Sequence, residues 1–240
     1  MLDLPVAAAQ GLRVTVLSDR RRDRDPRPLV DCSDVEQPQF HAPLPTMMEG
    51  SKPTMSQFSE ALMKAIPRPC RGRPFVCEGS PEQCLVVVIG ENPATELNVD
   101  WWEYWDESRG FLFDEWTAVY QQLRKRSGKA AVSPTRLRLN RLRDHGVKCL
   151  ETNVFFNEKL GGPGRGTPNK DMLDLALSSL PALQFLIAHG RAAHKYLQEK
   201  GPLPSTILKV FCTKHFRLES YETIRLIAQE ILATQQRRPQ

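Results

Sequence analysis

The order of hydrophobic and polar positions predicts four strands in this chain. The clearest is at residues 85–89, where five large apolar residues occur in a row and four of them are β-branched. Such a run is typical of a strand buried on both faces, as in a parallel sheet. Three further short apolar runs, at residues 147–156, 182–188 and 207–212, predict the other strands.

Helical spacing of apolar residues alternates with these strands. Asp114 is expected to cap a helix that runs to about Lys125, and Gly146 to end one that follows Pro134. The other helices are expected at residues 56–66, 170–179, 191–199 and 219–232. Because strands and helices alternate four times, we predict an α/β fold: a three-layer α/β/α sandwich with a central, mostly parallel four-stranded sheet.

The first part of the chain has a different composition. Residues 20–28 are a dense mixture of charges and prolines, and residues 37–53 are rich in Pro, Met and polar side chains. Such a composition buries too little apolar surface to offset the entropy of ordering. We therefore expect residues 1–54 to be a disordered or weakly ordered extension, and residues 55–240 to form the α/β domain.

Composition restricts where this protein works. The 240 residues contain no apolar run long enough to span a membrane, and the N-terminus lacks the basic and apolar pattern of a signal peptide. The six cysteines, at positions 32, 70, 77, 84, 149 and 212, form no CxxC pair. We interpret them as reduced thiols and expect a cytoplasmic protein, in a bacterial-type cytosol or nucleoid, without a membrane partner.

Charge is unevenly distributed along the chain. The formal net charge is +5, and residues 1–54, with 7 basic and 8 acidic side chains, contribute −1 to it. Residues 124–143 contain eight Lys or Arg side chains and no acidic one. This stretch suits a phosphate backbone, although a solvated helical face would have the same composition.

Polar residues stand at the carboxyl end of every predicted strand. They are Glu91 with Asn92, then Asn153, His189 and His215. In a parallel sheet these ends share one edge, so residues far apart in sequence can converge there. An amide or carboxylate can position a water, and an imidazole can stabilise a leaving anion. Each residue alone is equally compatible with an ordinary turn or a structural hydrogen bond.

Four segments together resemble the uracil-DNA glycosylase superfamily. Residues 90–94, Gly-Glu-Asn-Pro-Ala, resemble its first motif, and residues 151–154, Glu-Thr-Asn-Val, its central strand. Residues 188–193 look like its L-G-x-x-A segment, and residues 213–218 stand where the superfamily has H-P-S-P-L. The order and spacing of all four agree with the superfamily across residues 70–232.

The resemblance implies roles for individual residues. Asn92 corresponds to the residue that positions the attacking water, and Glu91 to the acidic residue of related branches. Asn153 corresponds to the asparagine that reads the base edge, and His215 to the histidine at the leaving group. These residues imply a monofunctional DNA glycosylase that needs neither a metal nor another cofactor, acts as a monomer and cleaves a uracil or other deaminated base.

An extruded base also needs an apolar face to stack on and contacts to the surrounding DNA. Phe111 is the expected stacking ring and Trp105 the second choice, while Gly90 and Pro93 are expected to line the base pocket. Three residues of the last motif, Lys214, Arg217 and Leu218, are expected to contact DNA. Arg165, in the glycine-rich loop, is expected to do the same.

The chain departs from the superfamily at three places. Ala94 replaces the usual glycine, the prolines after His215 are absent, and residues 95–110 form a longer and more aromatic insert. The spacing of Cys70, Cys77 and Cys84 does not match an iron–sulfur branch, so no cluster is expected. Two other functions stay open: a nucleic-acid-binding relative without catalysis, and an enzyme acting on free nucleosides or nucleotides.

Overall fold

The computed structural model describes residues 13–16, 57–93, 95, 97, 99–155 and 168–237. All of these residues belong to one compact unit, and a second unit, Asp19–Thr54, lies outside the described residues. The prediction of a disordered extension over residues 1–54 therefore stays a prediction. Within that segment the structure describes a single strand, β1 (Arg13–Val16), which the sequence pattern did not indicate.

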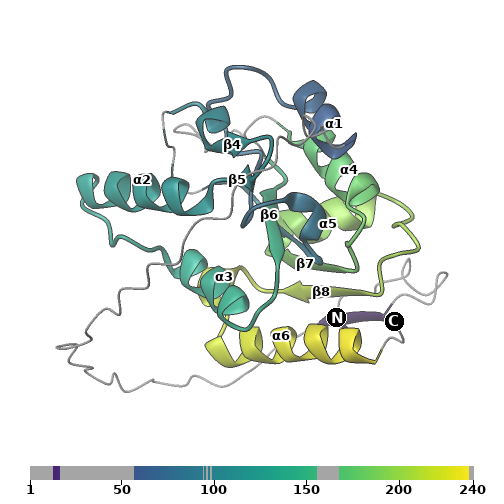
Figure 1. Ribbon diagram of the computed structural model, residues 1–240. Coiled ribbons are helices and arrows are strands. Elements are labelled where there is room, and N and C mark those ends of the chain that lie inside the picture. Colours follow the sequence, from purple (N-terminus) through teal and green to yellow (C-terminus); the bar gives the residue numbers. More distant parts are fainter. Residues whose placement is uncertain are drawn as a thin grey trace, which may run out of the picture. The chain divides into compact units, whose positions relative to one another are not determined.

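A six-stranded sheet organises the described residues, in the order β1-β8-β7-β3-β6-β2 (Figure 1). Five of its strands are parallel, and β2 pairs antiparallel with β6. The strands after β1 are β2 (Phe75–Val76), β3 (Val86–Gly90), β6 (Cys149–Asn153), β7 (Phe185–His189) and β8 (Lys209–Thr213). The mixed α/β fold with a mostly parallel sheet is confirmed. The four predicted strands are the four central ones, and the expected number of four was too low.

The helices occur in the predicted order. They are α1 (Gln57–Ala65), α2 (Phe113–Arg126), α3 (Pro134–Asp144), α4 (Lys170–Ser179), α5 (Arg191–Glu199) and α6 (Tyr221–Gln236). The predicted cap of α2 was wrong, because the helix starts at Phe113 and Asp114 lies in its first turn. Gly146 follows α3 with a φ of 81°, a backbone conformation that glycine adopts without strain.

Alternate residues of the four central parallel strands pack into two separate cores. Val86 and Val88 of β3 belong to one core, which α3 and α6 complete. Val87 and Ile89 belong to the other, which includes residues of α1, α2, α4 and α5. This is the period-two pattern of a strand covered on both faces. It places α3 and the carboxyl ends of β3, β6 and β7 next to one another.

The tryptophan-rich insert is part of the packing. A short 3₁₀ helix, η3 (Trp101–Tyr104), leads into the hairpin β4 (Trp105–Asp106) and β5 (Gly110–Phe111). The indole of Trp101 is buried and donates a hydrogen bond to the Phe75 carbonyl over 2.9 Å. The indole of Trp102 donates to the Pro67 carbonyl over 2.8 Å. These contacts hold the insert against β2 and the segment that precedes it.

Candidate functional site

The sheet aligns four residues at its carboxyl edge. Asn153 is the register partner of Gly90, the neighbouring Ile89 pairs with Ala188, and His189 pairs with Thr213. A Cβ atom at Gly90 would lie 2.7 Å from Asn153 Oδ1 and 2.8 Å from His189 Nε2. Gly90 is therefore the gap between two polar side chains, and any larger residue would displace them.

His189 is a buried, neutral imidazole. Its ring stacks on Phe216 with centroids 4.6 Å apart and meets the His215 ring edge-on at 5.0 Å. Burial, and secondarily the nearby His215, lowers the pKa of His189 from 6.5 to about 3. Its Nδ1 atom is buried and has no hydrogen-bond partner among the described residues. A neutral ring has one N–H to donate and one nitrogen that accepts.

His215 has a defined tautomer. The backbone N–H of Arg217 donates to its Nδ1 over 3.2 Å, so the proton of the neutral ring belongs on Nε2. Burial, and then the charge of Arg217, lower the pKa of His215, while Glu91 opposes the shift. The half-buried ring therefore offers an N–H donor at the rim of the site, as stabilisation of a leaving anion requires.

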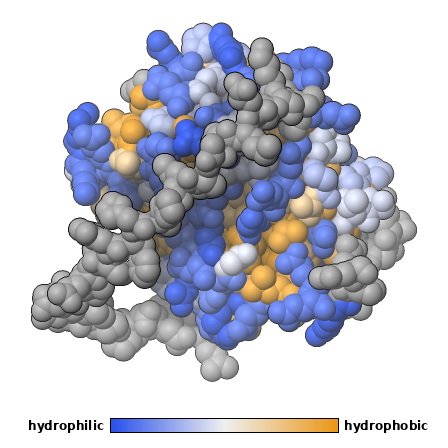
Figure 2. Space-filling model, viewed as in Figure 1, coloured by the Kyte–Doolittle hydropathy of each residue, from blue (hydrophilic) through white to orange (hydrophobic). Residues whose placement is uncertain are grey.

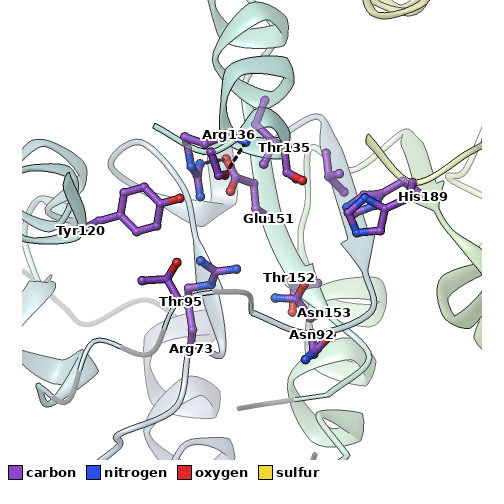
Figure 3. A pocket seen from close by; sticks show the side chains of 14 residues that line it. Arg73, Asn92, Thr95, Tyr120, Thr135, Arg136, Glu151, Thr152, Asn153 and His189 are labelled. Carbon is purple, nitrogen blue, oxygen red and sulfur yellow. Dashed lines mark hydrogen bonds and ion pairs between the residues drawn. The ribbon is translucent and has the colours of Figure 1, made fainter. Parts of the chain in front are cut away.

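The amides are held differently from the imidazoles. Asn153 is 8% exposed, and its backbone carbonyl accepts a hydrogen bond from the Asn169 side chain over 3.1 Å. The same Asn169 amide donates to the Thr152 hydroxyl over 3.0 Å. The half-buried Asn92 lies near Asn153 in Figure 3. Asn153 is thus fixed by its backbone, with its side chain left for the cavity.

Opposite the amides is a buried ion-pair network. Glu151 accepts a hydrogen bond from Arg136 Nη1 over 2.6 Å and a second, shorter one from Arg143 Nη2. Burial alone would raise the pKa of Glu151, but these two guanidinium groups outweigh it and lower the pKa. Arg136 also lies 4.9 Å above the ring of Trp116. The carboxylate therefore stays charged and ties α3 to β6.

These groups surround one cavity of about 60 Å³. Figure 3 shows Arg136 and Glu151 on one side, Tyr120, Thr95 and Arg73 on another, and Asn92, Asn153 and His189 across from them. The remaining lining residues are Val88, Ser133, Thr135, Leu139, Thr152 and His215. The volume is enough for a few water molecules. A polar, nearly filled cavity at the carboxyl edge of a parallel sheet is a candidate functional site.

The structure brings some of the predicted site residues together. Asn92, Asn153 and His215 line the cavity, and Gly90 lies between two of its walls. Glu91 does not line it: with Arg191, Lys195 and Tyr196 it borders a second hollow of about 550 Å³. Adjacent residues of the first motif therefore face different hollows.

The expected stacking rings lie elsewhere. Phe111 is 2% exposed, and its ring packs against Phe75, Trp101 and Trp116 within the aromatic core. Neither Phe111 nor Trp105 lines the cavity, whereas Tyr120 does. Because both rings pack against other aromatic side chains, Phe75 and Trp101 among them, they hold the fold together in this structure.

The expected DNA-contacting residues lie beside His215. The 3₁₀ helix η4 (Phe216–Leu218) exposes Arg217 and leaves Leu218 65% exposed, and Lys214 is also exposed. Pro93 is buried, and Arg165 lies outside the described residues. One face of the molecule, shown in Figure 2, is largely hydrophilic with smaller hydrophobic areas.

Sequence reasoning missed the charged wall of the cavity. Glu151 and Arg136 were visible, one as a carboxylate inside an apolar strand and the other within the basic stretch. A carboxylate in a buried strand requires a paired cation. The position of Glu151 in such a strand therefore predicted a buried Arg or Lys partner. His189 was recognised as a polar strand end but was not assigned a role in the predicted site.

The described residues show neither a metal site nor a membrane-spanning helix, and the sequence has no match among known families. Among the described residues, no group of three His, Cys, Asp or Glu side chains is placed to hold a metal ion. No helix in the described part of the chain is long and apolar enough to cross a membrane. The chain matches no protein-family model, and a search of curated proteins found none with significant sequence similarity.

Proposed function

We propose that this protein is a monofunctional DNA glycosylase of the uracil-DNA glycosylase type, with a three-layer α/β/α domain, acting on a flipped uracil or other deaminated base. The observation that supports the proposal is the convergence of Asn92, Asn153, His189 and His215 around Gly90 at the carboxyl edge of the parallel sheet. These groups come from four different strand ends and match the chemistry of N-glycosidic hydrolysis.

In the proposed reaction, Asn92 orients a water molecule toward C1′ of the deoxyribose. The C1′–N bond breaks, and its electron pair leaves with the base as an anion. The Nε2–H of His215 stabilises that negative charge, and Asn153 pairs with the polar edge of the base. The water oxygen becomes the C1′ hydroxyl, and one proton of the water ends on the released base.

Extrusion of the base leaves a gap in the duplex that needs filling. Leu218 is suited to this because it is 65% exposed and directly follows the turn that carries His215. Arg217 lies next to it on the surface. We expect these two residues to contact DNA, and Arg217 to bind a phosphate of its backbone.

The cavity size favours a second candidate, a relative that binds nucleic acid without cleaving it. A volume of about 60 Å³ is well below the roughly 300 Å³ at which ligand pockets begin. For a base to enter, lining side chains have to move. A chain in which they do not move would retain surface binding and lose hydrolysis.

Incubation with damaged oligonucleotides distinguishes these candidates. Single- and double-stranded DNA with uracil, mismatched thymine, hypoxanthine or xanthine is treated with the protein and then with alkali, which cleaves abasic sites. We expect strand cleavage by the wild-type protein. The cleavage rate should fall by about a hundredfold or more in His215→Ala and in Asn92→Ala. The control is Glu222→Gln, an exposed change on α6 that leaves the cavity intact.

The outcomes lead to different functions. If no abasic product forms from any substrate while salt-sensitive DNA binding persists, the second candidate replaces the first. If the protein does not bind DNA even at low salt, both fail, and an enzyme acting on free nucleosides or nucleotides remains. If the protein binds DNA without cleaving it, Arg217→Ala should lower the slope of log affinity against log salt concentration by about 1, the effect of losing one phosphate contact.

A further inference from the structure

The most exposed large apolar side chains of the described residues lie on three elements that pack against one another. Leu137 belongs to α3, Leu218 to η4, and Tyr221 and Leu226 to α6, and all four are between 40% and 65% exposed. Helix α3 packs against both η4 and α6, and Figure 1 shows it beside the beginning of α6. Apolar side chains concentrated on one part of a folded surface point to a binding face, whereas singly scattered ones need no explanation.

The outer face of α3 is positively charged. The side of this helix that carries Arg136 and Leu139 lines the cavity. Arg138 is half-buried and Arg141 is exposed, and their spacing of three residues puts them on one side of the helix. Asp144 is the single acidic residue of α3, and it stands at the last position. The outward charge of the helix is therefore mainly that of two guanidinium groups.

Arg138 is held in a fixed orientation on this face. Its Nε atom donates a hydrogen bond to the Glu219 carbonyl over 3.1 Å, and its Nη1 atom donates to the Pro134 carbonyl over 3.1 Å. The guanidinium carbon lies 4.5 Å from the centroid of the Tyr221 ring, which is a cation–π contact. Both acceptors are neutral carbonyls, so these contacts position the guanidinium without neutralising it. A positioned guanidinium loses less conformational entropy when it binds an anion.

The same contacts place Arg138 next to the residue expected to fill the duplex. Glu219 directly follows Leu218, the exposed side chain of η4. Glu219 itself is buried, and the exposed Glu222 is paired with Arg225. These two carboxylates therefore do little to offset the positive charge between η4 and α3. The apolar Leu218 and the basic face of α3 are parts of one surface.

We propose that the outer face of α3, with Arg138, Arg141 and Tyr221, binds the backbone of duplex DNA beside the extruded base. The inference rests on the proposed function in taking DNA as the partner, but it does not require cleavage. Unpaired guanidinium groups suit a phosphate backbone, because they bind phosphate with paired hydrogen bonds. The proposal also divides the basic stretch at residues 124–143, since it assigns DNA contact to the α3 part and none to the end of α2.

The test is the salt dependence of binding to an undamaged, fluorescently labelled DNA duplex, measured by anisotropy with the full-length protein. Arg138→Gln combined with Arg141→Gln should lower the slope of log affinity against log salt concentration by about 2, because each phosphate contact contributes roughly 1. The matched control is Lys125→Gln combined with Arg126→Gln. It removes the same charge from the same basic stretch, at exposed positions of α2, whose main neighbouring element is η3. Its slope should stay at the wild-type value.

A second variant protects the test against misfolding of the α3 double variant. Tyr221→Leu keeps an apolar side chain at an exposed position and removes no charge. It should weaken DNA binding about two- to fivefold, the effect of losing one cation–π contact near the surface, and leave the salt slope unchanged. The two variants together separate the charge of Arg138 from its positioning.

The outcomes separate this proposal from the glycosylase. A lower slope in the α3 double variant of a chain that cleaves none of the damaged substrates would retain the DNA surface and reject the glycosylase. An unchanged slope in that variant would overturn the DNA surface even if the chain cleaves, as would failure of the wild type to bind duplex DNA. Self-association that the α3 double variant abolishes, with unchanged DNA affinity, would assign the face to a second protein copy and also overturn the proposal.

Discussion

At the scale of single residues, the site depends on the absence of a side chain. Asn153 Oδ1 and His189 Nε2 both approach the position that a Cβ of Gly90 would occupy. Gly90 is paired in register with Asn153 of β6, and the preceding Ile89 with Ala188 of β7, so its backbone cannot move away without disturbing the parallel pairing. The glycine therefore sets how closely an amide and an imidazole approach the end of β3.

We predict that Gly90→Ala destroys the site. The new methyl group would clash with two buried polar groups, at 2.7 Å and 2.8 Å, and such overpacking typically costs about 1–3 kcal/mol. Urea denaturation measures that loss. Glycosylase activity should fall below detection in the same protein.

The control for this change is Gly128→Ala. Gly128 has a φ of 67°, but its Cβ would meet no atom of the described residues within 4 Å, so only backbone strain is added there. It should lower stability modestly and leave the activity of the site unchanged. Equal activity losses in Gly90→Ala and Gly128→Ala would mean that crowding at Gly90 is not the cause.

At the scale of elements, the connection between α3 and β6 decides how the basic stretch is used. Of its eight basic side chains, those of Arg124 and Arg136 are buried, and that of Arg143 is 7% exposed. The guanidinium of Arg124 donates to the Ala130 carbonyl and to the Thr95 hydroxyl. A part of the stretch is thus turned inward, and the remaining part faces solvent. Composition alone could not separate these two uses, because both have the same charge.

We predict that Glu151→Gln destabilises the protein by about 3–5 kcal/mol, the usual loss when one member of a buried ion pair is removed. The change leaves Arg136 and Arg143 without their shared carboxylate while keeping the size of the side chain. Chemical denaturation at neutral pH gives the free energy of unfolding.

Glu78→Gln is the matched comparison for that prediction. Its carboxylate pairs with Arg143 from a side chain that is 51% exposed, so solvent already screens the pair. The loss should be no more than about 1 kcal/mol. A similar loss in both variants would show that the buried network does not hold α3 to β6.

At the scale of the whole molecule, the buried His189 links folding to pH. Its pKa is about 3 in the folded chain and 6.5 in the reference state, so an unfolded chain binds a proton that the folded chain does not. The stability that results is complete above about pH 6.5 and is lost as the pH falls toward about 3. The loss amounts to about 1.4 kcal/mol for each pH unit inside this window.

We therefore predict that His189→Asn flattens the acid side of the stability profile. Between about pH 6 and about pH 5, wild-type stability should fall by about 1.4 kcal/mol more than that of the variant. Urea titrations at both pH values measure this difference. The interval lies above the ordinary pKa of Glu151, which is 4.5, so loss of that carboxylate contributes little there.

His215→Asn provides the comparison for the pH profile. The pKa of His215 is also lowered, so replacing His215 should remove the contribution of this residue to the loss of stability at acid pH. The contribution of His189 should remain in that variant. If the stability of His189→Asn fell with decreasing pH as steeply as that of the wild type, His189 would not be the cause of the acid sensitivity. The wild-type fold would then tolerate a charged imidazole at this position.

Much of the architecture was predictable from local pattern. The apolar run at residues 85–89 and the helical spacing at residues 170–179 and 191–199 gave elements close to those observed. The two strands that were missed have specific causes. β2 has two residues, too few to show a period, and β1 lies in a segment whose composition predicts disorder. Strand pairing supplies the stabilisation that such local sequences lack.

The sequence by itself determined which residues stand at strand ends, because hydrophobic periods mark where each buried strand stops. It therefore located Asn92, Asn153 and His215, which the parallel sheet then brings to one edge. Only the tertiary structure decided that Glu91 faces another hollow and that Phe111 belongs to the aromatic core. The physical reason is that side-chain direction and burial depend on packing between distant elements, which no local pattern contains.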